Sequence, residues 1–117
     1  MPATSVANVT RPDLAISVQR SATEATVTLS GEIDMSTVGR LTKAIDDLLS
    51  PAPPRVVLDL GGVTFCDSQG LGTLVVLSRR TSLAHSHLIL VNLQDFLLRV
   101  LDITGLRGAL TIREDTA

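Results

Sequence analysis

Apolar and polar residues alternate over two segments near the start of the chain. In residues 14–18 every second position is apolar, and the same period returns in residues 25–29. A period of two is typical of strands that bury one face. Residues 21–24 between them are small or polar and can reverse the chain, so the two segments are predicted to form a β-hairpin.

Three later segments have apolar residues at helical spacing. The first, residues 38–49, stops at the proline-rich residues 51–54, because proline cannot continue a helix. The second runs from about residue 68 to 84, and the third covers residues 94–104. Gly105 follows the third segment and can adopt the left-handed conformation that often ends a helix.

Three short apolar runs complete the set of predicted elements. Residues 56–60 show little alternation, which is typical of a central strand with parallel neighbours, and residues 88–91 and 110–112 are predicted as further strands. Two strands followed by three helix–strand units require β-helix-β crossovers and therefore a largely parallel sheet. The predicted fold class is α/β, with one domain over residues 13–117 after a flexible N-terminal tail, residues 1–12.

Composition and charge narrow the possible partners. The chain of 117 residues is 44% hydrophobic with two aromatic residues, both Phe, so its core must be aliphatic. A formal net charge of -2 offers no basic field for nucleic acid or an anionic membrane. Cys66 is the single cysteine, which suits a reducing compartment. No apolar run approaches the ~20 residues that span a bilayer, so we expect a soluble, cytoplasmic protein without direct nucleic-acid or membrane partners.

Ser68 is the residue with the clearest candidate chemistry. It follows the apolar run 56–60 and a predicted loop over residues 61–69, and it precedes Gly70 and Gly72 at the predicted helix start. A phosphate at such a helix start meets unpaired backbone N–H groups and the positive end of the helix dipole. Serine is also a favoured helix cap. The residues alone therefore leave a phosphoacceptor and a simple cap equally balanced.

The residues around Ser68 also have structural and functional interpretations. Asp34 and Asp67 are typical of turns and caps, and either could line a site around Ser68. Gly70 could line a phosphate cradle or could serve close packing, which is the commoner reason for glycine at such a turn. Cys66 is unpaired amid apolar residues, which favours a core position over a redox role.

An enzyme is disfavoured by the surroundings of Ser68. The nucleophile elbow of hydrolases has glycine two residues before and after the serine, but Cys66 occupies the first of these positions. His85 and His87 follow the predicted helix, at the opposite end of the sheet, and are poor candidates for a general base. Glycine motifs of nucleotide-binding proteins and metal-binding Cys/His clusters are also absent from the sequence. We therefore expect no enzymatic activity, no cofactor and no metal.

Three segments resemble the STAS domain, a family named for sulphate transporters and anti-sigma factor antagonists. They are residues 29–34 (Leu-Ser-Gly-Glu-Ile-Asp), residues 57–60 together with 65–72 (Phe-Cys-Asp-Ser-Gln-Gly-Leu-Gly), and residues 100–106 (Val-Leu-Asp-Ile-Thr-Gly-Leu). The resemblance covers nearly the whole chain. It implies a single STAS-like domain with a mixed, mostly parallel sheet of about five strands and with helices packed mainly on one face.

The resemblance also implies roles for individual residues. Ser68 matches the residue that is phosphorylated in antagonists of this family, Asp67 matches the acid before it, and Asp34 matches an acid that lines the same rim. With Gln69 and Gly70 these residues form the expected partner-binding surface. Many relatives have a second Ser or a Thr where this chain has Gln69. Gln69 therefore removes an alternative phosphoacceptor and leaves Ser68 in place.

The function that the resemblance implies is that of an anti-sigma factor antagonist. In its unphosphorylated form such a protein binds an anti-sigma factor that is also a serine kinase, and this binding frees a sigma factor. Phosphorylation of Ser68 would end the binding, and a serine phosphatase is a further expected partner. Phosphate is expected to change the interface and not the fold. The alternative is a STAS scaffold or transporter-accessory module that binds a partner without phosphate control.

Overall fold

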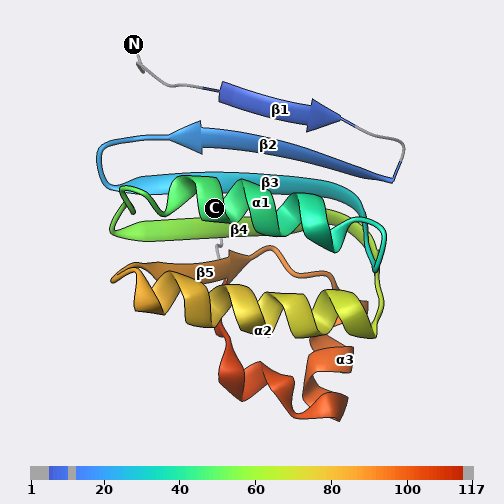
Figure 1. Ribbon diagram of the computed structural model, residues 1–117. Helices are drawn as coiled ribbons and strands as arrows, with labels where there is room; N and C mark the ends of the chain where they lie inside the picture. The colour runs from blue at the N-terminus through green and yellow to red at the C-terminus, as the bar shows by residue number, and fades with distance from the viewer. Residues whose placement is uncertain (1–5, 11–12, 115–117) are drawn as a thin grey trace.

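The computed structural model describes residues 6–10 and 13–114. Within these residues one six-stranded sheet runs in the order β1-β2-β3-β4-β5-β6 (Figure 1). The strands are β1 (Val6–Thr10), β2 (Leu14–Arg20), β3 (Glu24–Ile33), β4 (Arg55–Cys66), β5 (His87–Val91) and β6 (Thr111–Arg113). The helices are α1 (Val38–Leu48), α2 (Ser68–Leu83), α3 (Asp95–Thr104) and the 3-10 helix η1 (Leu106–Ala109).

The sheet is mixed and mostly parallel, as the sequence predicts. Strands β1, β2 and β3 pair antiparallel, whereas β3 with β4, β4 with β5 and β5 with β6 pair parallel. Residues 6–10 were predicted as part of a flexible tail, but they form β1, an edge strand in addition to the five that the pattern predicts. Five residues are too short to show a clear period, and this strand needs β2 as its hydrogen-bonding partner. Residues 1–5 and 11–12 of the predicted tail lie outside the described residues.

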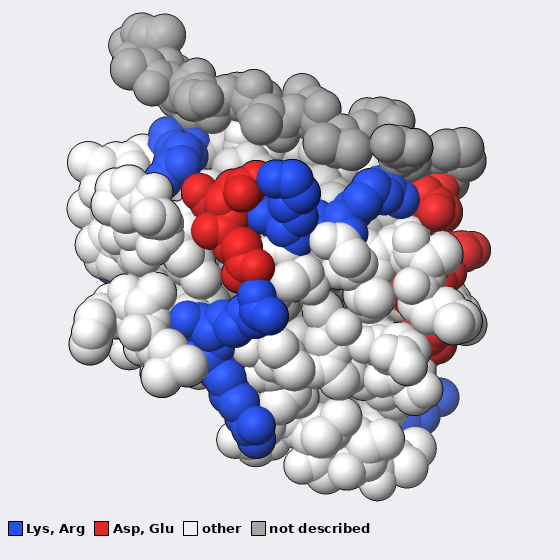
Figure 2. Space-filling model, viewed as in Figure 1, with Lys and Arg blue, Asp and Glu red and all other residues white. Residues whose placement is uncertain are grey.

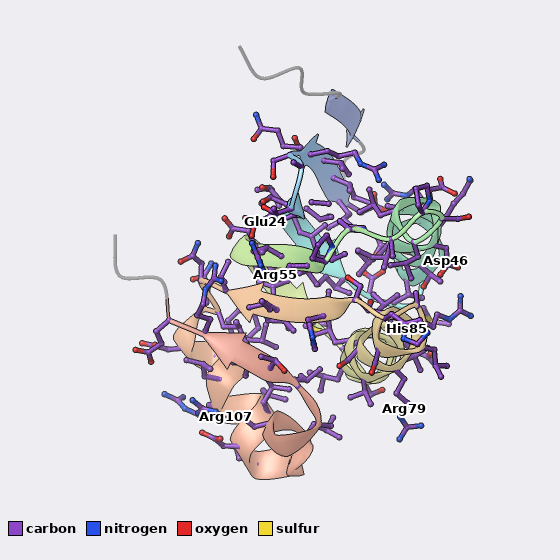
Figure 3. The ribbon with its side chains drawn as sticks, turned by 90° about the vertical axis from the view of Figure 1, so that its left-hand side faces the viewer. Glu24, Asp46, Arg55, Arg79, His85 and Arg107 are labelled. Atoms are coloured by element: carbon purple, nitrogen blue, oxygen red, sulfur yellow. The ribbon has the colours of Figure 1, made fainter. Side chains whose placement is uncertain are left out.

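Helices α1 and α2 cover the same face of the sheet (Figure 1), and the view turned by 90° shows both on one side of the strands (Figure 3). One aliphatic core fills the space beneath them, with fully buried leucine and isoleucine side chains from the strands and from all three α-helices. The largest include Leu29, Ile33, Leu41, Ile45, Leu74, Leu77, Leu97 and Leu101. Across the described ranges, no helix is both long and apolar enough to cross a membrane.

Strand β4 extends further than the sequence predicts. The predicted strand ends at residue 60, but β4 continues to Cys66, and its pairing with β3 is irregular near Gly62. The Gly61-Gly62 pair suggests a turn, yet a Cβ at Gly62 would lie 2.9 Å from the carbonyl oxygen of Leu29. Glycine there therefore permits a close approach to β3, not a reversal of the chain.

The extended end of β4 is supported on both sides. Its pairing with β5 ends at Asp59, while its pairing with β3 reaches Cys66. Where the pairing with β5 has ended, the side-chain amide of Gln94 donates hydrogen bonds to the carbonyl oxygens of Gly61 (2.9 Å) and Val63 (3.2 Å). The strand that leads into Ser68 is thus held by backbone bonds on one edge and by a side-chain amide on the other.

Candidate functional site

Ser68 is the first residue of α2 and follows the end of β4 after one intervening residue. Its side chain is exposed, at the end of the sheet where the parallel strands terminate, on the right of Figure 1. Within the described part of the chain, its hydroxyl makes no hydrogen bond. A hydroxyl that is exposed and unbonded is accessible to a modifying enzyme.

Asp67, and not Ser68, caps helix α2. One carboxylate oxygen of Asp67 accepts a hydrogen bond from the backbone N–H of Gly70 at 2.8 Å. The other accepts one from the backbone N–H of Met35 at 3.2 Å, and the Asp67 N–H donates to the carbonyl oxygen of Ile33. Asp67 therefore satisfies an orphan donor of the helix and also ties the helix start to the β3–α1 turn.

Asp34 lies in this β3–α1 turn and forms it. Its carboxylate accepts from the Ser36 hydroxyl at 2.6 Å and from the Ser36 backbone N–H at 2.9 Å. The Ser36 hydroxyl is the main reason that the pKa of Asp34 is lowered. The turn role expected for Asp34 is present, and the link from Met35 to Asp67 brings this turn to the helix start that carries Ser68. A role in partner binding remains a prediction.

Gly70 is buried, which corrects the expectation that it belongs to the partner-binding surface. A Cβ at this position would lie 2.6 Å from the Ile33 carbonyl oxygen and 2.7 Å from the Cys66 sulfur. Glycine here lets α2 start against the end of β3, so close packing explains it. Gln69, beside it, is exposed and remains a candidate contact residue.

Cys66 is a packing residue, as the sequence favours. Its side chain is half-buried against the core. Burial, with a smaller contribution from the adjacent Asp67 charge, raises the pKa of the Cys66 thiol to about 12. The thiol is therefore protonated at neutral pH and is a poor nucleophile.

Both histidines lie at the far end of α2 from Ser68. The helix has 16 residues, which corresponds to about 24 Å of axial rise, and His85 follows its C-terminal end. Figure 3 views the molecule from this far edge, where His85 is labelled. His87 begins β5 at the same edge, opposite Arg55. Neither imidazole is placed to act as a general base for Ser68.

Two exposed apolar residues near the start of α2 were not predicted from the sequence. Met35 is 74% exposed and Phe65 is 47% exposed. Met35 stands in a polar turn between Asp34 and Ser36, and a large apolar residue in such a turn is a signal that could have been used. Phe65 gave no such signal, because a phenylalanine in the predicted loop over residues 61–69 could also fold back onto the domain.

A family model described as "Mlab, STAS domain" matches residues 16–113 of the chain. An anti-sigma-B factor antagonist of Staphylococcus epidermidis is 28% identical over 90 residues, covering 77% of this chain and 83% of that protein. The protein of the same name from Staphylococcus aureus (strain NCTC 8325 / PS 47) is 27% identical over the same shares of each chain.

Solved structures show the same fold. An anti-sigma factor antagonist from Mycobacterium paratuberculosis has a TM-score of 0.76 and 28% identity, covering 89% of each chain. The antagonist SpoIIAA in its unphosphorylated form has a TM-score of 0.71 and 19% identity, covering 86% of this chain and 88% of that one. SpoIIAA in its phosphorylated form has a TM-score of 0.67. Both forms of that protein resemble this chain in fold.

Proposed function

The chain belongs to the STAS domain family, and on that basis we propose that it is an anti-sigma factor antagonist controlled by phosphorylation of Ser68. In the unphosphorylated form it binds an anti-sigma factor that is also a serine kinase, and so it frees a sigma factor. Phosphate on Ser68 ends this binding, and a serine phosphatase restores it. Partner proteins of this type place the protein in the cytoplasm. The antagonists among its relatives and structural neighbours support the proposal.

The observation that carries the proposal is the state of the Ser68 hydroxyl. It is exposed at the start of α2, and the capping role that could have occupied it belongs to Asp67. A kinase can therefore reach this hydroxyl without opening the fold. Gln69 next to it carries no hydroxyl, so Ser68 has no competing acceptor at the following position.

The charge of a phosphate is expected to leave the domain folded. Phosphorylation adds about -1.5 to -2 charges, and negative charge at a helix N-terminus is favourable by typically about 0.3–1 kcal/mol. The adjacent carboxylate of Asp67 opposes that gain. Like charges brought together at an interface can cost several kcal/mol, and about 1.4 kcal/mol is a tenfold change in affinity. The modification therefore changes binding far more than folding.

A direct test is phosphorylation by purified candidate anti-sigma factor kinases with ATP, followed by mass spectrometry of the modified peptide. We expect phosphate on Ser68, no phosphate on the Ser68→Ala variant, and loss of the complex on a sizing column after complete modification. Binding that persists after complete modification would favour a scaffold without phosphate control. Phosphate on another residue would contradict the assignment of Ser68.

A substitution separates the interface from the fold. We expect Ser68→Asp to weaken partner binding by about tenfold or more, with a thermal melt and circular dichroism spectrum close to those of the parent. Ser68→Ala is the matched control and should retain binding, because the hydroxyl holds no bond in the described structure. A collapsed melt of Ser68→Asp would refute the interface mechanism.

A further inference from the structure

The two edge strands of the sheet differ in length and in charge. Strand β6 has three residues, Thr111–Arg113, and ends in a charged residue. Strand β1 has five residues, Val6–Thr10, with the sequence Val-Ala-Asn-Val-Thr. Short length, charge and proline are common features that keep an edge strand from pairing with another chain. Strand β6 has two of these features, whereas β1 has the ordinary length of a strand and contains neither charge nor proline.

The outer side of β1 has backbone groups that can pair with a further strand. Strand β1 pairs antiparallel with β2, from Val6 opposite Gln19 to Thr10 opposite Ala15. In an antiparallel ladder, the N–H and C=O groups of alternate residues point toward the partner strand, and those of the residues between them point away. Within the described residues, no strand lies beyond β1 (Figure 1). About half of the backbone donors and acceptors of β1 therefore face away from the sheet.

We propose that β1 pairs antiparallel with β1 of a second copy of this chain, about a twofold axis midway between the two Asn8 residues. In this register the opposed residues are Asn8 with Asn8, Ala7 with Val9, and Val6 with Thr10. All five residues are then paired in both copies, whichever of them direct their backbone groups outward. The two sheets join into one sheet with six strands from each copy. This inference goes beyond the proposed function and does not rest on it.

A second copy is the partner that the sequence of β1 fits. Residues 6–10 have no charge, so the twofold axis brings no like charges opposite each other, which would be destabilising. The same lack of charge gives β1 no electrostatic means of selecting an unrelated strand. Val6, Val9 and Thr10 are β-branched, and such residues favour extended strands. A twofold contact uses the same surface on both copies, so this edge is complementary to itself.

The charges on the helix-covered face do not oppose this pairing. The axis is perpendicular to the sheet, so the helices of both copies lie on the same face, and Figure 1 shows α1 over β3 and β4. Figure 2 shows Lys and Arg side chains next to Asp and Glu side chains on that face. Lys43 forms an ion pair with Asp47, and Arg80 forms one with Asp46. Because these charges are matched within one copy, the two copies do not meet as surfaces of a single sign.

The joined sheet keeps both Ser68 residues accessible. Strands β2 and β3 separate β1 from β4, the strand that leads to Ser68. The twofold axis rotates the second copy by half a turn, so the two Ser68 hydroxyls lie at opposite ends of the joined sheet. With a spacing of about 4.8 Å between neighbouring strands, the two β4 strands are about 34 Å apart. One dimer therefore presents two separate sites, and phosphorylation of Ser68 is expected to leave the dimer intact.

Disulfide crosslinking tests the register of the purified chain. Asn8→Cys places two thiols opposite each other, where the Cα atoms of an antiparallel pair are about 4.5–5.5 Å apart, within the range of a disulfide. Val6→Cys is the matched control on the same strand, because its two thiols would be separated by about 13 Å along the joined strands. Under mild oxidation we expect Asn8→Cys to form a covalent dimer about tenfold faster or more. Cys66 is half-buried with a pKa raised to about 12, so the wild-type chain should form none.

Sedimentation equilibrium tests the dimer without a crosslink. We expect the wild-type chain to form dimers as its concentration rises to about 1 mM, because a short backbone ladder gives an affinity in the micromolar to millimolar range. Asn8→Lys brings two like charges together across the axis and should weaken dimerisation by about tenfold. Thr111→Lys adds the same charge at an exposed position of β6 and should leave dimerisation unchanged.

Each outcome of these two experiments supports or overturns the pairing of β1. A wild-type chain that stays monomeric up to about 1 mM overturns it. Equal crosslinking of Asn8→Cys and Val6→Cys also overturns it, because random collision would then explain both. If Asn8→Lys changes the thermal melt of the chain, the two cysteine variants decide the result. Ser68→Asp should dimerise as wild type, so a failure of this inference is distinct from a failure of the proposed function.

Discussion

The two ends of helix α2 hold charge in different ways. At the N-terminal end, both carboxylate oxygens of Asp67 bond to backbone N–H groups, those of Gly70 and Met35. At the C-terminal end, Arg80 forms an ion pair with Asp46 of α1 at 2.6 Å, and both side chains remain about half exposed. Each charge has the sign that interacts favourably with the helix dipole. Only the Asp67 carboxylate, however, is hydrogen-bonded to backbone groups.

The difference supports the proposal that the N-terminal end of α2 is the end that binds a partner. Backbone donors fix Asp67 in one place, so the adjacent Ser68 is presented from a rigid edge. An exposed ion pair between two long side chains gives little stability and constrains little of the backbone. A site that must present one hydroxyl in a defined position needs rigid support, and the N-terminal end of α2 provides it.

Among the substitutions that test this comparison, Gly70→Ala is expected to have the largest effect on stability. The added methyl would meet the Ile33 carbonyl oxygen at 2.6 Å and the Cys66 sulfur at 2.7 Å. The backbone oxygen cannot move aside cheaply, so we expect a loss of about 1–3 kcal/mol in the free energy of unfolding. Chemical denaturation followed by circular dichroism measures it.

Gly72→Ala is the matched control for Gly70→Ala. It lies two residues along the same helix, and a Cβ there would have nothing within 4 Å. Alanine is favoured over glycine inside a helix by about 1 kcal/mol, so this variant should be slightly more stable than the parent. Equal effects of the two substitutions would contradict the close approach of α2 to β3.

The second effect compares the two ends directly. Asp67→Ala removes the cap of α2 and the bond to Met35, and we expect it to cost about 1–2 kcal/mol of stability. Arg80→Ala removes the exposed ion pair with Asp46 and should cost about 0–1 kcal/mol, less at high salt. Thermal melts at low and high salt test both. A larger loss of stability in Arg80→Ala than in Asp67→Ala would contradict the conclusion that the N-terminal end of α2 is the more rigid one.

Most of the fold was predictable because its signals are local. Strand periods of two, helical spacing and Gly105 as a helix end are set by neighbouring residues, and Gly105 has the left-handed φ of 75°. Strand β1 was missed because its stability depends on β2. The extension of β4 was missed because Gly61 and Gly62 serve a contact with another strand, which the local sequence does not reveal.

The site was predictable in position but less so in detail. Ser68 and Asp67 were found because they stand between a strand and a helix. Which of the two caps the helix depends on the Asp67 backbone conformation, extended at ψ of -175°, and sequence alone does not fix it. Gly70 was expected at the surface and is buried against Ile33. The exposure of Phe65 depends on the end of β4, so no local pattern could have shown it.

The smallest effect concerns the β3–α1 turn beside the rigid end. The Ser36 hydroxyl is the main cause of the lowered pKa of Asp34. Ser36→Ala should therefore raise the pKa of Asp34 toward the ordinary value of 3.8, as measured by NMR titration of the carboxyl group. Ser82→Ala, a change of the same kind at an exposed residue near the far end of α2, is the control and should leave the pKa unchanged.

The sign of the accompanying stability change follows from the lowered pKa of Asp34. A carboxyl group whose folded pKa lies below its unfolded value stabilises the fold above the unfolded pKa, and this contribution is lost as the pH falls through the folded pKa. The melting temperatures of wild type and Ser36→Ala should therefore differ above about pH 4 and converge as the solution becomes more acidic. A difference that grew in acid would show that Asp34 is not held ionised by Ser36. The turn would then be held by the hydrogen bonds of Thr37 and Asp67 and by the backbone bonds to the Asp34 carbonyl oxygen.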